Sequence, residues 1–161
     1  MALKIARLIN LILAGMLTGH EFAGLVGVHP ALGKLPPLAR LRAEQQIYRH
    51  YGKIMPFYMI STFASFLPVL ALDRDRESPA FRFALAGVTC SAAMLAITLT
   101  RNLPINSRIV EMPAEEASVE EFRELRERWD RLHAARNLLN VAGLVFTCLG
   151  ALSRSGSGEA S

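Results

Sequence analysis

The sequence predicts an all-α integral membrane protein: a four-helix bundle with an interfacial helix between its first two spans and a long fourth helix that extends out of the membrane. Hydrophobic residues make up 52% of the 161 residues, more than is usual in a soluble domain. Charge is segregated, because residues 111–131 are dense with it while long stretches carry almost none. Four apolar runs have about the length that crosses a bilayer as a helix. They are residues 5–28, 54–72, 80–100 and 134–152.

The first span carries a small residue at every fourth position, namely Gly15, Gly19, Ala23 and Gly27. Such a ridge lets another helix approach the backbone closely within a membrane. That helix belongs either to the same bundle or to a second copy of the chain. Homo-oligomerisation through this ridge is therefore one expectation.

The segment between the first and second spans has a Pro36-Pro37 breaker and then a charged stretch. We expect an interfacial amphipathic helix from about Leu38 that leads into the second span. After the third span, Pro104 is expected to break the helix, because a proline lacks the backbone N–H that a helix needs.

The last helix is predicted by a Ser118-x-x-Glu121 capping box. It should run from about Val119 through the fourth span to Leu152. Residues 1–152 then form a single domain, and residues 153–161, which are rich in Ser and Gly, are expected to be a disordered tail.

Charge and composition limit the partners. The net charge of +4 comes from arginines beside apolar runs, which suits lipid headgroups and gives no reason to expect a nucleic-acid partner. We expect the chain in the bacterial inner membrane. Four spans put both termini on one side, but the count of Lys and Arg does not fix the orientation, because the connections on the opposite side are longer.

A polar stripe enters the fourth span. Trp129, His133, Arg136, Asn137 and Asn140 are three and four residues apart, so they share one face of a helix. Ionisable groups in hydrocarbon cost free energy, so this face should meet protein or a water-filled cavity. The alternative is that Arg136 extends to the headgroups while the asparagines bond to neighbouring helices.

The topology brings further polar residues to the same end of the bundle, among them His20, His50 and Asn102. Two chemistries fit this end. In one, the imidazoles of His20, His50 and His133 bind a metal ion together with Glu21 or Glu44, although no two share a His-x-x-x-His spacing. Glu21 pairs otherwise with His20 or with an arginine of a neighbouring segment.

The other chemistry needs no metal ion or other cofactor, and it is the one we expect. His133 acts as a base while Arg136 stabilises the resulting anion. Trp129 offers a stacking face for a flat aromatic substrate, or else serves as an interfacial anchor.

Two short motifs carry a family resemblance. Asn102-Leu103-Pro104-Ile105-Asn106 is followed, after a charged loop, by Arg128-Trp129-x-x-x-His133-x-x-Arg136. Together they resemble the anthrone oxygenase family of small four-span membrane proteins, and the resemblance spans nearly the whole chain.

The resemblance implies an enzyme that oxidises a hydrophobic aromatic substrate, anthrone-like or phenol-like, with dioxygen. Under this hypothesis Asn102, Asn106 and Asn137 help to bind the substrate beside His133 and Arg136. Two other classes stay open: a non-catalytic protein that binds a hydrophobic small molecule or packs against a partner, and a metal-dependent redox enzyme.

Overall fold

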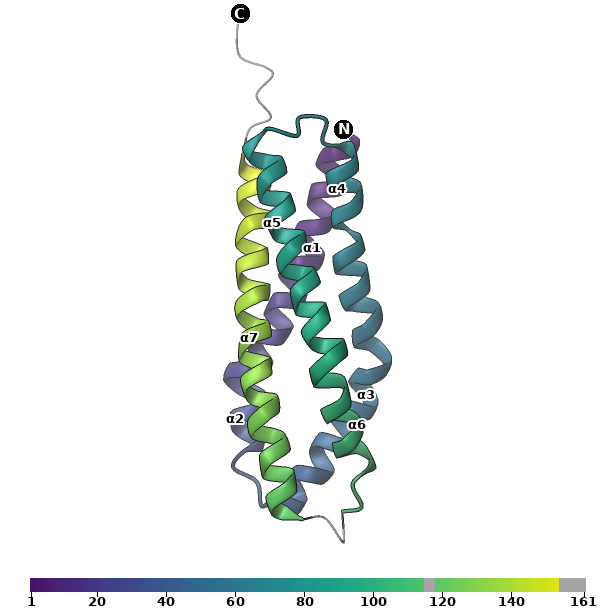
Figure 1. The fold of residues 1–161 in the computed structure, drawn as a ribbon, viewed down its shortest axis with the longest axis vertical. Helices are drawn as coiled ribbons and strands as arrows, with labels where there is room; N and C mark the ends of the chain where they lie inside the picture. Colours follow the sequence, from purple (N-terminus) through teal and green to yellow (C-terminus); the bar gives the residue numbers. More distant parts are fainter. Residues whose placement is uncertain (115–117, 154–161) are drawn as a thin grey trace, which may run out of the picture.

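The computed structural model describes residues 1–114 and 118–153, and all regular secondary structure in these residues is helical. Four helical rods lie side by side (Figure 1). The first consists of α1 (Ala2–Ala23), the π-helical turn η1 (Gly24–Val28) and α2 (His29–Leu32), and the second of α3 (Pro37–Ala64) and α4 (Phe66–Leu72). The third consists of α5 (Pro79–Ile97), the π-helical turn η2 (Thr98–Asn102) and α6 (Leu103–Glu111), and the fourth is α7 (Val119–Leu152).

The rods form an antiparallel bundle in which α7 packs against α1 and α5, and α4 packs against the same two helices from the other side. The start of α1 and the end of α7 lie at the same end of the molecule (Figure 1). Each predicted span falls within one rod. The predicted four-helix bundle is therefore confirmed, and so is the expected run of the last helix, whose first turn is capped by the Ser118 hydroxyl on the Glu121 N–H. The predicted tail, apart from Ser153, lies outside the described residues.

The segment expected to be interfacial is the first half of α3, which continues without a break into the second span. Its apolar side packs on α6 and α7 rather than lying alone at a surface. The buried residues of this contact are Leu41, Tyr48, Ile105, Ile109, Met112, Phe122 and Trp129. This end of the bundle is consequently held by its own apolar core.

Pro104 does not break the third rod, contrary to our expectation. It occupies the second position of α6, directly after the wide turn η2, and Pro30 has the same place in α2 after η1. A proline ring collides with the carbonyl four residues earlier in an ordinary α-helix. A π-helical turn before the proline relieves that collision, so the rod continues. Asn102 and Asn106 thereby stay on a continuous helix beside α7.

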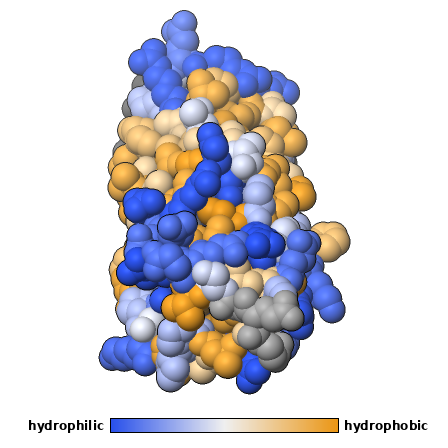
Figure 2. All heavy atoms as spheres, turned by 60° about the horizontal axis from the view of Figure 1, so that its bottom comes forward, coloured by the Kyte–Doolittle hydropathy of each residue, from blue (hydrophilic) through white to orange (hydrophobic). Residues whose placement is uncertain are grey.

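The outer surface of the rods is strongly apolar. All four are long and apolar enough to cross a membrane, and large side chains such as Phe57 and Leu138 are more than two-thirds exposed. Figure 2 looks toward the end that carries the α2–α3 and α6–α7 connections and shows a mostly apolar band between hydrophilic ends. A surface of this kind is stable against lipid. We conclude that the chain is an integral membrane protein.

The small-residue ridge of α1 does not pack inside the bundle. A Cβ atom added at Gly15, Gly19 or Gly27 would meet no other atom within 4 Å, and Ala23 is exposed. The alternative that this ridge packs inside the bundle is thus wrong. Contact of the ridge with a second copy of the chain stays a prediction.

The close approach between helices occurs instead at Gly87 of α5. A Cβ atom there would lie 2.9 Å from Cε1 of Phe66, a residue that is only 2% exposed. We expect Gly87→Ala to lower the free energy of unfolding by about 1–3 kcal/mol through overpacking. Unfolding by SDS in mixed micelles measures this, with Gly15→Ala as the matched control. Equal stability of the two variants would contradict the tight contact.

Candidate active site

The polar stripe of α7 faces the interior of the bundle. Trp129, His133, Arg136, Asn137 and Asn140 are all less than 9% exposed. The prediction that this stripe meets protein is confirmed, and Arg136 does not extend to the headgroups. Burial also excludes the role of interfacial anchor for Trp129, because an anchor must reach the membrane surface.

Glu21 of α1 supplies the carboxylate that pairs with the buried Arg136 of this stripe. Nη2 of Arg136 donates to both carboxylate oxygens of Glu21 at 2.6 Å. Both side chains are less than 9% exposed, so each charge is compensated mainly by the other. Of the partners expected for Glu21, the arginine of a neighbouring segment is the one observed. Nε of Arg136 has no hydrogen-bond partner among the described residues.

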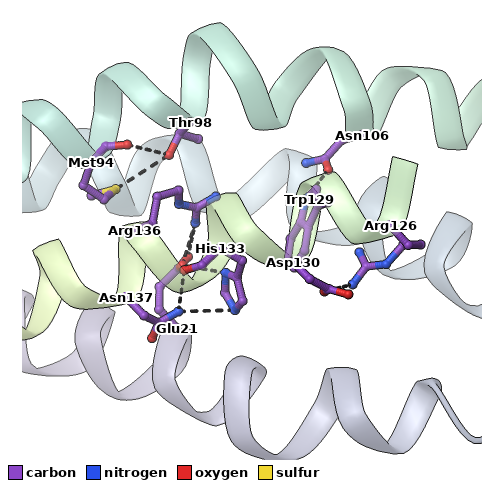
Figure 3. Close-up of polar contacts among 10 residues, drawn as sticks. All are labelled: Glu21, Met94, Thr98, Asn106, Arg126, Trp129, Asp130, His133, Arg136 and Asn137. Carbon is purple, nitrogen blue, oxygen red and sulfur yellow. Dashed lines mark hydrogen bonds and ion pairs between the residues drawn. The ribbon is translucent and has the colours of Figure 1, made fainter. Parts of the chain in front are cut away.

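His133 lies between Glu21 and Asn137 (Figure 3). Its Nδ1 is 3.3 Å from Oε2 of Glu21, and its Nε2 is 3.3 Å from Nδ2 of Asn137. A carboxylate beside Nδ1 and an amide N–H beside Nε2 favour the tautomer that carries its proton on Nδ1. In this tautomer Nε2 carries the lone pair, which faces the Asn137 amide N–H.

Three aromatic rings meet at this point. The Trp129 indole stacks on the His133 imidazole, with centroids 4.5 Å apart and an angle of 28° between the planes. The ring of His29 packs edge-on against both, at 4.5 Å from Trp129 and 5.1 Å from His133. The indole N–H donates to Oδ1 of Asn106 at 2.7 Å. Since Trp129 already contacts His133, His29 and the Arg126 guanidinium, a substrate that stacks on it has to displace one of these side chains.

Asn102 has a different environment from Asn106. Its side chain is fully buried, and neither its nitrogen nor its oxygen has a hydrogen-bond partner among the described residues. Asn106 meets Trp129, and α7 runs antiparallel to the third rod, so Asn102 lies one turn along, beside the turn that holds His133. We therefore place Asn102 at the level of the imidazole.

A second group of charges, which we call the outer cluster, lies on the far side of Trp129. It consists of Arg40, Glu44, Tyr48, Arg126 and Asp130. The fully buried carboxylate of Glu44 accepts a hydrogen bond from Nε of Arg40 at 2.9 Å and lies 3.2 Å from Nε of Arg126. Arg126 also donates to Tyr48 and Asp130, and its guanidinium lies 4.3 Å from the centre of the Trp129 ring.

Of the four predicted metal ligands, Glu21 and His133 come together, but His20 and His50 do not join them. His20 packs on Tyr51 with ring centroids 5.0 Å apart, His50 is exposed beside the same tyrosine, and Glu21 is bound to Arg136. Within residues 1–114 and 118–153, no group of three or more His, Cys, Asp or Glu side chains is placed to hold a metal ion. The geometry therefore does not form the site expected from His20, His50, Glu21 and His133.

Among the side chains that contact Trp129, sequence reasoning missed three: His29, Tyr48 and Arg126. Arg126 extends the stripe, because it precedes Trp129 by three residues, and that spacing was a usable signal. His29 gave none, since the sequence places it only before a proline, whereas the residue lies at the start of α2 beside Trp129.

The geometry can be compared with known proteins. The family model for anthrone oxygenase matches residues 45–146. The chain belongs to the anthrone oxygenase family. A curated relative, anthrone oxygenase gedH of Aspergillus terreus (strain NIH 2624 / FGSC A1156), is 31% identical over 103 residues, which is 63% of this chain and 68% of the relative. No solved structure matches the chain.

Membership of the anthrone oxygenase family supports an oxygenase-like role. The matched residues include Trp129, His133 and Arg136, together with Asn102 and Asn106. Glu21 and His29 lie before the matched segment, although both contact His133 in the structure. The site is thus assembled from the family segment and from the first rod.

Proposed function

We propose that the chain is a membrane-embedded oxygenase that oxidises a hydrophobic aromatic substrate of the anthrone type with dioxygen, in the bacterial inner membrane. The observation that carries the proposal is the 3.3 Å approach of Nδ1 of His133 to the Glu21 carboxylate, from which we infer that Nε2 of the buried imidazole is the base. A hydrophobic substrate reaches such a site from the bilayer, which dissolves it.

The reaction needs a base and dioxygen. Nε2 of His133 removes one proton from the acidic methylene of the anthrone. The carbanion forms a carbon–oxygen bond with dioxygen, and the imidazolium returns its proton to the distal oxygen, giving a hydroperoxide. Loss of the second methylene proton then breaks the oxygen–oxygen bond and forms the carbonyl, while hydroxide and that proton leave as water. One anthrone and one dioxygen give one anthraquinone and one water.

The negative charge that develops on the substrate oxygen needs a donor. Arg136 was expected to supply it, and its Nη2 is engaged with Glu21 while its Nε has no partner. The amide of Asn102 is also without a partner. A buried polar group left unpaired costs about 1–3 kcal/mol, so binding of the substrate oxygen by Arg136 Nε and Asn102 recovers this cost. Asn137 keeps Nε2 of His133 in place, and Asn106 holds Trp129.

Turnover by the purified protein tests the proposal. The protein is placed in lipid nanodiscs with anthrone, and oxygen uptake and anthraquinone absorbance are followed together against the same nanodiscs without protein. We expect protein-dependent uptake of one dioxygen per anthraquinone, unaffected by treatment with a chelator. Rates equal to the protein-free control would refute an oxygenase acting on anthrones and leave a binding role.

Gly24 of η1 gives a more local test, because its backbone packs against the base. A Cβ atom at this position would lie 3.3 Å from Nε2 of His133 and 3.7 Å from Cδ2 of His29. The imidazole must then move by a few tenths of an ångström, and we expect Gly24→Ala to lower kcat about tenfold. Gly19→Ala is the matched control, since nothing lies within 4 Å of its added Cβ atom. Equal kcat values in the two variants would show that Nε2 is not the reacting atom.

A further inference from the structure

We propose that Arg126 and Glu44 of the outer cluster act as positioning residues that set the proton affinity of His133 through the Trp129 ring. The inference rests on the proposed role of His133 as the base. Its structural basis is a continuous row of contacts that runs from Glu44 through Arg126 and Trp129 to His133 (Figure 3 shows its last three members).

The indole ring separates two cationic positions. The Arg126 guanidinium lies 4.3 Å from the ring centre, and the His133 ring stacks 4.5 Å from it. Figure 3 shows Trp129 between these two side chains, as expected for residues three before and four after it on one helix. An aromatic face attracts a cation, but a proton on His133 would add a second positive charge close to the first. Arg126 therefore opposes protonation of His133.

The negative charge of Glu44 weakens the effect of Arg126 on the protonation of His133. Its fully buried carboxylate lies 3.2 Å from Nε of Arg126, while Asp130, which pairs with Nη2 of the same guanidinium, is 48% exposed on its side chain. A buried countercharge is screened much less than an exposed one. Glu44 thus compensates Arg126 more effectively than Asp130 does.

The other titratable and charged groups near His133 do not act on its proton affinity in the same way as Arg126 and Glu44. Glu21 of α1 lies beside Nδ1 and is itself paired with Arg136, and His29 of α2 packs edge-on. From α3, Arg40 and Tyr48 reach Glu44 rather than the imidazole. On the third rod, the buried polar residue at the level of His133 is the uncharged Asn102, and Asn106 contacts Trp129, whereas the neighbouring Arg101 is exposed. Removing the charge of Arg126 or of Glu44 should therefore change the proton affinity of His133 without removing any of its hydrogen bonds.

The test measures the titration of His133 in three variants. The chain has 4 histidines, so imidazole NMR signals of labelled protein in micelles are few, and the signal of His133 is the one lost in His133→Gln. We expect Arg126→Gln to raise the titration midpoint of His133 by about half a pH unit to one unit, and Glu44→Gln to lower it by a similar amount. Asp130→Asn, at a partly exposed site, should lower it by about a quarter of a unit.

The acid limb of the pH–rate profile should move with the NMR midpoint, since His133 must be neutral to accept a proton. Midpoints that stay fixed, or that move in one direction in Arg126→Gln and Glu44→Gln alike, would overturn the inference and leave these residues a purely structural role. If Arg126→Gln or Glu44→Gln fails to fold, Asp130→Asn still tests the inference, because its site is partly exposed. An unchanged midpoint in that variant would overturn the inference. The NMR midpoint needs no substrate, so opposite shifts in a protein without turnover would refute the proposed function alone.

Discussion

Glu21→Leu is expected to lower the free energy of unfolding by about 3–5 kcal/mol, because it leaves the guanidinium of Arg136 buried without its countercharge. Arg136 is 6% exposed, and both of its short hydrogen bonds, at 2.6 Å, go to Glu21. Unfolding by SDS in mixed micelles measures the loss.

The double variant Glu21→Leu, Arg136→Met is the control for this prediction. It replaces the ion pair with apolar side chains of similar length, so most of the stability should return. Turnover should not return, since His133 has lost the carboxylate beside Nδ1. If Glu21→Leu is as stable as the wild type, the ion pair between Glu21 and Arg136 is not formed in the membrane.

His133→Gln is expected to lower kcat for anthrone oxidation by about 10²–10⁴-fold, the usual contribution of a general base. Stability should change little, because glutamine keeps a polar side chain next to Asn137 and the helix is held elsewhere by its apolar contacts. Oxygen uptake in nanodiscs measures the effect.

His20→Gln is the matched control for this loss of activity. His20 lies on the first rod one residue before Glu21, but its ring packs on Tyr51 rather than on the site. We expect its kcat to stay within about twofold of the wild type, since the half-buried His20 ring packs on Tyr51 and has no hydrogen bond to His133 or Arg136. A loss equal to that of His133→Gln would point to a shared metal site instead of a base.

The fold was predictable because a bilayer imposes simple requirements. Four apolar runs of sufficient length, a charged turn and the capping box at Ser118 define four rods and their order. Pro104 was misjudged because the local rule for prolines takes no account of a preceding π-helical turn. The ridge of Gly15, Gly19 and Gly27 was ambiguous for a related reason: spacing shows that residues share a face, but not whether that face looks inward.

The site was predictable along one helix and not between helices. Spacing alone identified the buried stripe of α7, including His133 and Arg136. The choice of Glu21 as their common partner depends on how α1 and α7 are aligned along the bundle axis, which no local pattern fixes. The same holds for Glu44 and Arg126, which are more than 80 residues apart in the sequence and meet only in the folded bundle.

The central claim is that His133 removes a proton from the substrate methylene, and isotope exchange without dioxygen tests it most directly. Anthrone is incubated anaerobically in deuterated buffer with the protein in nanodiscs, and deuterium in the methylene is followed by mass spectrometry. We predict rapid exchange with the wild type and with His20→Gln, and exchange at the protein-free rate with His133→Gln. Equal exchange by the wild type and His133→Gln would contradict the assignment of His133 as the base.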